Sequence, residues 1–289
     1  MRWQNEEQSE NVEDRRGMSP GPLAIGGGIG TVVIVLLVSL ITGADPRALL
    51  QQVARVQPPA RQRQAGPVNA RPEEERQAKL VGATLHMTED VWSDIFAQAG
   101  KRYEKPKLVL FRHQVQTEGC GFADTAVGPF YCPGDHKVYI DLAFYEELAR
   151  RFKAPGEFAQ AYVIAHEVGH HVQNLLGISE RVSSLQRRAN RIEANQLSVR
   201  LELQADYLAG VWANHAEKMK HILEEGDIEA ALNAAARIGD DALQKQARGY
   251  VVPDSFTHGT SAQRVKWFRK GLVSGDINGG DTFRAGDDL

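Results

Sequence analysis

An uncharged stretch near the amino end places the strongest limit on what this chain can fold into. No charged residue occurs at positions 17–44, and positions 23–42 supply 20 mostly apolar residues. At about 1.5 Å per residue, a helix of that length spans the ~30 Å hydrocarbon layer of a bilayer. The stretch predicts a retained transmembrane helix; a cleaved signal peptide and a buried core helix are the alternatives.

The residues on either side of this stretch bear on its orientation. A cleaved signal begins with a short basic region, whereas residues 1–16 are acidic overall. Arg15 and Arg16 precede the apolar stretch and Arg47 and Arg55 follow it, so the positive-inside rule barely discriminates. The short leading tail and the long remainder favour a single-pass protein with its tail inside and its body outside the cytoplasmic membrane.

Composition then divides the chain into four parts. Residues 1–22 are predicted to be a cytoplasmic tail, 23–42 the transmembrane helix, and 43–72 a linker rich in Pro, Gln and Arg that cannot bury enough apolar surface to fold. Residues 73–289 have a length that suits one domain. The net charge of −3 shows no excess of basic residues, so we expect no nucleic-acid partner.

The domain is expected to be mostly helical with a small sheet, an α+β fold. Apolar runs predict strands at 107–111 and 138–142, the second either interior or an edge that pairs with an extended substrate. Thr88 is predicted to cap a helix. Further helices are expected at 155–176, 181–195, 197–218, 228–238 and 262–272.

The most informative motif is His-Glu-Val-Gly-His at residues 166–170, within a predicted helix. His166 and His170 differ by about 40° around that helix, so their imidazoles can converge on one zinc ion. Glu167 lies on the same flank, where it can reach a zinc-bound water without being a ligand. The alternative is a pair of core histidines that bind no metal.

A third ligand is needed, because catalytic zinc takes three protein ligands and a water. Glu202 and Asp206 lie one helical turn apart on an otherwise apolar face, where carboxylates are costly unless paired or ligated. We assign Glu202 to the metal, one zinc per chain, and Asp206 to a hydrogen bond from a ligand imidazole. The alternative is a solvated helix, on which this spacing is common.

These motifs together resemble a known family. The sequence HEVGHH at 166–171, followed by ELQAD at 202–206 and preceded by one apolar helix, is similar to the bacterial "putative neutral zinc metallopeptidase" family. Further resemblance lies at 120–121, 128–133 and 255–264. The resemblance implies a zincin-like, gluzincin-type domain, a zinc cofactor and peptide hydrolysis as the activity. The expected partner is therefore a peptide or protein substrate. Together with the apolar stretch, the resemblance leads us to expect a bacterial inner-membrane protein with a periplasmic domain.

The sequence departs from that family pattern at two places. Tyr207 stands where relatives often carry a cysteine after ELQAD, and a second cysteine is missing around Gly279 and Gly280. Both absences together indicate the loss of one disulfide and leave the metal site intact. They put the rigidity of the carboxyl-terminal tail in doubt.

The expected mechanism is hydrolysis by a zinc-activated water, with Glu167 as the general base. His258, in a loop rich in Gly, Ser and Thr, is the candidate donor to the oxyanion; a surface loop histidine beside a helix cap is the alternative. Cys120 and Cys132 lie in a Gly-rich loop without zinc-ligand spacing. They are expected to form a disulfide, with two buried free thiols as the alternative.

A membrane-anchored zinc metallopeptidase is therefore the predicted function. The alternatives are a non-catalytic zinc-bearing binding or scaffold module of the envelope, and a zinc hydrolase of a non-peptide amide. The presence of Glu167 favours an enzyme, because a pure binding module needs no general base.

Overall fold

The computed structural model describes residues 1–17, 70–124, 127–286 and 289. Residues 1–15 and 69–289 form one compact unit, and residues 16–68 form another. The predicted transmembrane helix at 23–42 and nearly all of the predicted linker at 43–72 lie outside the described residues. Among the residues described, no helix is long and apolar enough to span a membrane.

The first compact unit contains two sheets. The strands are β1 (Val12–Asp14), β2 (Lys107–Phe111), β3 (Gln114–Gln116), β4 (Phe122–Asp124), β5 (Phe130–Cys132) and β6 (Lys137–Asp141). The larger sheet has the order β1-β2-β6-β5, with β1, β2 and β6 parallel and β5 antiparallel to β6. Strands β3 and β4 form a separate antiparallel pair.

Helices make up most of the rest of this unit, as far as its residues are described. They are α3 (Pro72–Gln98), α4 (Ala143–Arg150), α5 (Glu157–Leu175), α6 (Ile178–Gln186), α7 (Arg191–Lys220), α8 (Asp227–Arg237), α9 (Asp240–Arg248) and α10 (Ser261–Ser274), with 3₁₀ turns η2 (Pro253–Ser255) and η3 (Ile277–Gly280). The domain is thus mostly helical with a small sheet, as the sequence predicts.

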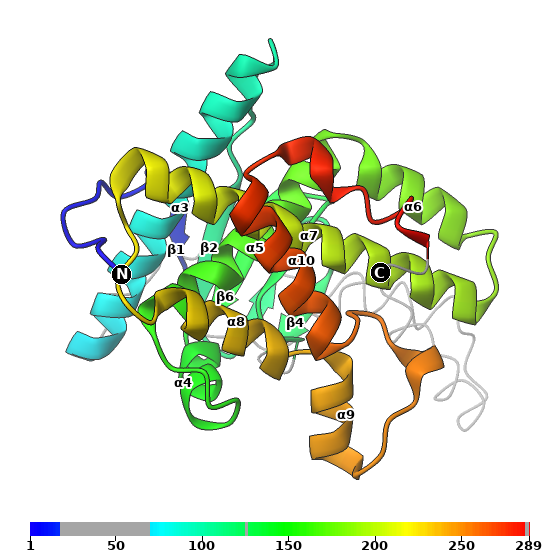
Figure 1. Cartoon of the computed structure of the whole chain (residues 1–289). Helices are drawn as coiled ribbons and strands as arrows, with labels where there is room; N and C mark the ends of the chain where they lie inside the picture. Colours follow the sequence, from blue (N-terminus) through cyan, green and yellow to red (C-terminus); the bar gives the residue numbers. More distant parts are fainter. Residues whose placement is uncertain (18–69, 125–126, 287–288) are drawn as a thin grey trace, which may run out of the picture. The chain divides into compact units, whose positions relative to one another are not determined.

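Helix α5 lies at the centre of this arrangement (Figure 1). It contacts β5 and β6 of the larger sheet, and it also packs on α3, α7 and α8. Its sequence is apolar on nearly every side, which is typical of a buried helix. The helix ends before Gly177, which adopts the left-handed conformation (φ 72°) that favours glycine. The metal motif therefore lies on the most enclosed helix of the domain.

The structure decides between the two alternatives for the strand expected at 138–142. This strand is β6, which is interior because it pairs with β2 on one side and β5 on the other, so it cannot pair with an extended substrate. One expectation from the sequence needs revision. Residues 1–15, which the sequence analysis separated as part of a tail, share the compact unit of the domain. Strand β1 is short and has no alternating apolar pattern, and it is stabilised by pairing with β2.

The predicted disulfide is present between Cys120 and Cys132, whose Cα atoms lie 5.9 Å apart. It ties the loop between β3 and β4 to the edge strand β5. The sequence contains only these two cysteines, so no thiol is left free.

The two positions that depart from the family pattern lie against each other. A Cβ atom on Gly280 would come within 2.4 Å of the Tyr207 ring, and a Cβ atom on Gly279 would come within 2.4 Å of its hydroxyl oxygen. Tyr207 is fully buried, and its hydroxyl donates to the carbonyl of Asp276. An aromatic side chain therefore holds the carboxyl-terminal segment at the place where the resemblance led us to expect the lost disulfide.

Candidate metal centre

The two motif histidines lie on α5 and the two carboxylates lie on α7, which packs against α5. Gly169, inside the motif, allows the close approach: a Cβ atom there would lie 3.0 Å from the carbonyl oxygen of Ala205. A larger residue at 169 would push the two helices apart. The sequence thus brings the histidines of one helix within reach of Glu202 on the other.

His166, His170 and Glu202 meet at one point. The Nε2 atom of His166 lies 3.1 Å from Glu202 Oε2, and the Nε2 atom of His170 lies 3.4 Å from Glu202 Oε1. One possible ligand atom from each of the three residues lies within 4.8 Å of the other two. Two imidazole nitrogens and one carboxylate oxygen make a donor set that zinc accepts, with a coordination position left open.

The other ring nitrogen of each histidine is fixed by a hydrogen bond. His166 Nδ1 donates to Asp206 Oδ1 (2.9 Å), and His170 Nδ1 donates to the side-chain oxygen of Gln173 (2.9 Å). Gln173 in turn donates to the carbonyl of Leu201 at 2.7 Å. Such partners orient a ligand ring and leave its Nε2 for the metal. Asp206 therefore accepts a hydrogen bond from His166, one of the two imidazoles that the sequence predicts as ligands.

The pKa values of these groups follow from burial and charge. Burial alone would lower the pKa of His166, but the carboxylates of Asp206 and Glu202 outweigh it and raise the pKa to about 10. Burial alone would raise the pKa of Asp206, but Arg264 and His166 outweigh it and lower the pKa to about 2. The pKa of His170 is raised as well, because the attraction of Glu202 exceeds the effect of burial.

These shifts predict how the stability of the metal-free protein depends on pH. A histidine whose folded pKa lies above its ordinary 6.5 stabilises the protein fully below pH 6.5, and the contribution disappears as the pH rises towards about 10. We therefore expect the free energy of unfolding, measured with urea after chelation, to be lower at pH 9 than at pH 6, by on the order of a few kcal/mol. In zinc-loaded protein the free energy of unfolding should decrease much less between these pH values, because the ion takes the place of the proton on His166. Equal stability of the metal-free protein at both pH values would contradict the charge state described here.

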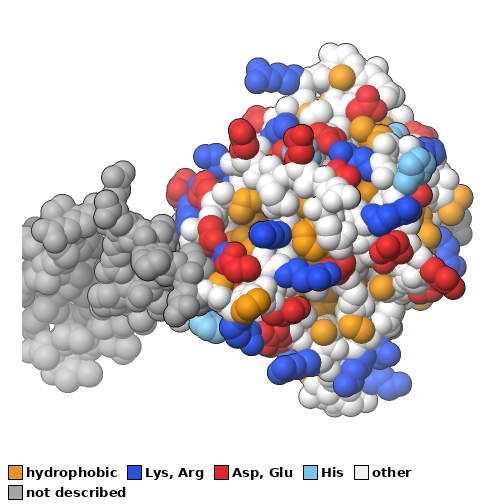
Figure 2. Space-filling model, turned by 90° about the vertical axis from the view of Figure 1, so that its left-hand side faces the viewer, with side chains coloured by type: hydrophobic (Ala, Val, Ile, Leu, Met, Phe, Trp, Pro, Cys, Tyr) orange, Lys and Arg blue, Asp and Glu red, His pale blue; other side chains and the backbone are white. Residues whose placement is uncertain are grey.

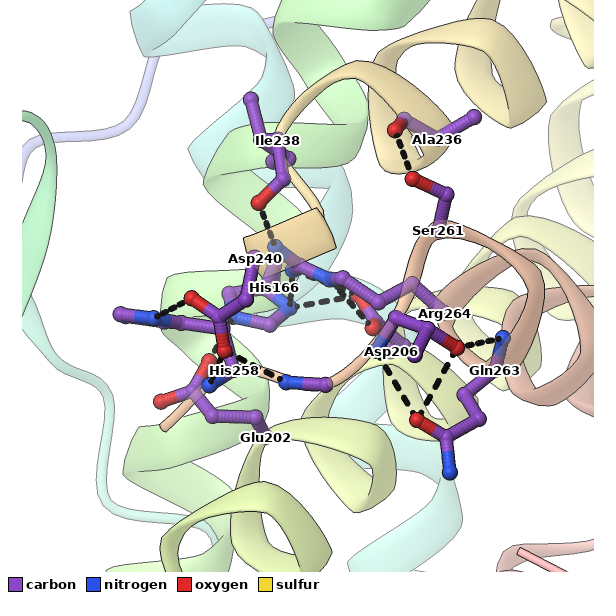
Figure 3. A network of polar contacts seen from close by, with 12 residues as sticks. His166, Glu202, Asp206, Ala236, Ile238, Asp240, His258, Ser261, Gln263 and Arg264 are labelled. Atoms are coloured by element: carbon purple, nitrogen blue, oxygen red, sulfur yellow. Dashed lines mark hydrogen bonds and ion pairs between the residues drawn. The ribbon is translucent and has the colours of Figure 1, made fainter. Parts of the chain in front are cut away.

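A buried arginine neutralises the carboxylate behind His166 (Figure 3). Arg264 of α10 is 3% exposed, and its Nε and Nη2 donate to the two oxygens of Asp206 at 2.8 and 3.0 Å. The hydroxyl of Tyr162 also donates to Asp206. Helix α10 can lie this close because Gly210 of α7 and Gly271 of α10 have no side chains. The network fixes His166 through Asp206.

Removing this arginine should destabilise the fold. Arg264→Met removes the guanidinium that bonds both oxygens of the buried Asp206 carboxylate and leaves His166 as its remaining charged partner. Breaking such a buried pair costs about 3–5 kcal/mol. The measurement is urea unfolding of the metal-free protein. Arg269→Met, at an exposed position of the same helix, is the matched control and should change stability by no more than about 0.5 kcal/mol. Similar effects of the two substitutions would show that the pair contributes nothing.

Glu167 differs from these groups. Glu167 is only 7% exposed, yet no described residue forms a hydrogen bond or ion pair with its carboxylate. An ionised carboxylate in such a place needs a polar partner, and the open side of the metal centre is where water or substrate can supply one. Glu167 therefore lies beside the donor set without belonging to it.

His258 is brought to the same place by the turn before α10. Figure 3 shows it and Asp240 next to Glu202 and His166. His258 Nδ1 lies 3.2 Å from Asp240 Oδ1, and the other carboxylate oxygen accepts the backbone N–H groups of Thr257, His258 and Gly259. The hydrogen bond to Asp240 raises the pKa of His258. Half of the imidazole is exposed, and no described residue bonds its Nε2 atom.

Three residues of this site were not predicted from the sequence. Arg264 lies in the segment that resembles the family, but nothing in that segment indicates that it pairs with Asp206. Gln173 follows His170 by three residues, a spacing that places it on the same helix face and could have signalled the contact. Asp240 is the first residue of α9, and an acidic residue in the first turn of a helix is common, so nothing in the sequence indicates its contact with His258.

Comparison with known proteins agrees with this geometry. The family model described as "Putative neutral zinc metallopeptidase" matches residues 1–283. The protein YpfJ of Escherichia coli strain K12 is 49% identical over 291 residues, covering 98% of this chain and 99% of YpfJ. The protein Mb2605 of Mycobacterium bovis is 44% identical over 217 residues, covering 72% of this chain and 71% of the relative. No solved structure is similar enough to count as a match. This chain belongs to the family of putative neutral zinc metallopeptidases.

Proposed function

We propose that this protein is a zinc metallopeptidase that hydrolyses peptide bonds at the His166–His170–Glu202 centre. The observation that carries the proposal is Glu167, a nearly buried carboxylate that no described residue pairs, adjacent to three convergent metal donors. A site built only to hold a metal, or only to bind a peptide, has no need of this group. The family description supports the same class of chemistry.

The residues of the chain divide the work of peptide hydrolysis. When bound, zinc supplies a Lewis acid that polarises the scissile carbonyl and lowers the pKa of water. The carboxylate of Glu167 accepts a proton from the attacking water and returns it to the leaving nitrogen. His258, oriented through Nδ1 by Asp240, presents Nε2–H to the carbonyl oxygen as negative charge develops there. Arg264 and Asp206 keep His166 in the tautomer that leaves Nε2 free.

We further propose that the protein is attached to the bacterial cytoplasmic membrane through the apolar residues 23–42, with the domain on the extracytoplasmic side. The disulfide between Cys120 and Cys132 supports this location, because such bonds persist in oxidising compartments. The proposed partners are a peptide or protein substrate and the membrane. Figure 2 shows acidic and basic side chains interspersed on one face, which supports the expectation that nucleic acid is not a partner.

The test is digestion of a diverse peptide library by the purified full-length protein, with zinc content measured on the same sample. We expect cleavage that is abolished by a chelator and restored by added zinc. Protein that holds zinc but cleaves no peptide would favour the scaffold module. Release of new amine and carboxylate groups from cell-wall material, with no peptide of the library cleaved, would favour the hydrolase of a non-peptide amide.

A further inference from the structure

The amino-terminal residues 1–15, which we call the N-terminal arm, form part of the sheet that supports the metal centre. Strand β1 pairs in parallel with β2, with Val12 opposite Leu108 and Asp14 opposite Leu110. Two more hydrogen bonds extend the pairing, from Leu108 N to the carbonyl of Asn11 (2.9 Å) and from Arg15 N to the carbonyl of Leu110 (2.8 Å). Figure 1 shows β1 beside β2 at the end of the sheet.

Side chains of the arm also complete the interior of the domain. Trp3 is 6% exposed and lies within the main core, with the guanidinium of Arg76 over its ring. Ser9 Oγ and Asn11 Nδ2 donate to the same oxygen of Glu89, at 2.6 and 2.8 Å. Glu89 is 1% exposed, so losing these donors would leave a buried carboxylate with fewer partners.

Other contacts of the arm are made with distant parts of the chain. Arg2 N donates to the carbonyl of Ile222 (2.8 Å), and Glu6 accepts from Lys220 Nζ (2.8 Å). The arm thus touches α3, β2 and the end of α7, and the family model also matches from residue 1. It is built into the domain by hydrogen bonds, a buried aromatic ring and an ion pair.

Because of these contacts, we infer that the N-terminal arm and the metal centre lie on the same side of the membrane. The inference rests on the proposed membrane attachment. If residues 23–42 crossed the bilayer once, ~30 Å of hydrocarbon would separate the arm from β2, and hydrogen bonds of 2.8 to 2.9 Å could not form. The same layer would separate the arm of one copy from the domain of a second copy, so an exchange of arms between two copies does not avoid this conflict. The arm and the domain therefore lie on one side of the membrane, in place of the opposite sides that a single crossing would give them.

The experiment compares the accessibility of two single cysteines in the full-length protein. Glu10→Cys reports the arm and Glu225→Cys reports the domain; both residues are exposed, and no described residue bonds either side chain. The two native cysteines are bonded to each other and do not react. Bacteria expressing each variant are treated with a membrane-impermeant maleimide, before and after permeabilisation. We expect the two cysteines to behave alike in intact cells.

The possible outcomes separate this inference from the proposed location. Labelling of both cysteines in intact cells supports the inference and the extracytoplasmic domain. Protection of both until permeabilisation supports the inference and contradicts that location. Labelling of only one in intact cells overturns the inference. As a second measurement, Glu6→Cys with Lys220→Cys should be joined by a short bis-maleimide in native membranes, and failure of this cross-link would also count against a docked arm.

Discussion

Replacing Glu167 with glutamine should lower the rate of peptide hydrolysis by ~10²–10⁴-fold and leave zinc binding nearly unchanged. Glutamine keeps the volume of the side chain and removes only its capacity to accept the proton of the attacking water. Zinc should stay because Glu167 is outside the group of three convergent donors. The measurement is the initial rate on the best-cleaved library peptide, with zinc content determined on the same sample.

Two comparisons sharpen this result. Glu180→Gln removes a carboxylate from an exposed position of α6 and should leave both rate and zinc content as in the wild type. Full activity of Glu167→Gln would mean that another group accepts the proton and that the mechanism proposed above is wrong. Loss of zinc together with activity would instead make Glu167 a ligand.

Replacing Glu202 with glutamine should weaken zinc binding more than any change to a residue behind the ligands. The amide can still contact the two Nε2 atoms, but it supplies no negative charge to the ion. Gln173→Leu is the matched comparison, because it removes no metal donor: it removes the acceptor of His170 Nδ1 together with the donor to the Leu201 carbonyl. Loss of such a partner typically costs ~10–100-fold in metal affinity. Competition with a chromogenic chelator measures both affinities.

The order of the two effects tests the ligand assignment. A larger loss for Glu202→Gln than for Gln173→Leu places Glu202 on the metal. The reverse order, or tightly held stoichiometric zinc in Glu202→Gln, would place the third ligand elsewhere. His166→Ala should lose both zinc and activity, since it removes a ligand nitrogen and the partner of Asp206 together.

Periodic apolar patterns predicted the elements around the site well. Helix α5 was expected at 155–176 and runs over Glu157–Leu175, and the strand expected at 107–111 is β2. These segments are buried, so the apolar pattern of each reflects its own packing. The spacing of the two histidines placed them on one helix face. The apolar neighbours of Glu202 and Asp206 indicated that these two carboxylates need a partner.

Features that depend on tertiary contacts were not predicted. Thr88 was expected to start a helix, but it is buried inside α3, where its hydroxyl donates to the carbonyl of Leu85. Helix α7 was expected to begin near residue 197, whereas a capping box at Asn190 and Glu193 starts it earlier. The pairing of Arg264 with Asp206 depends on how α10 packs on α7, and no local spacing encodes that.

The parallel pairing of β1 with β2 determines how a soluble form of the domain should be prepared. A protein shortened to residues 73–289 would present β2 as an open strand, and such strands recruit other chains into aggregates. It would also lack the indole of Trp3 and the two donors to Glu89. Recombinant protein that keeps residues 1–17 and replaces residues 18–69 with a short polar connection should stay monodisperse in size-exclusion chromatography, whereas the simple truncation should precipitate. The first residues of the chain thus decide whether the metal centre can be studied apart from the membrane.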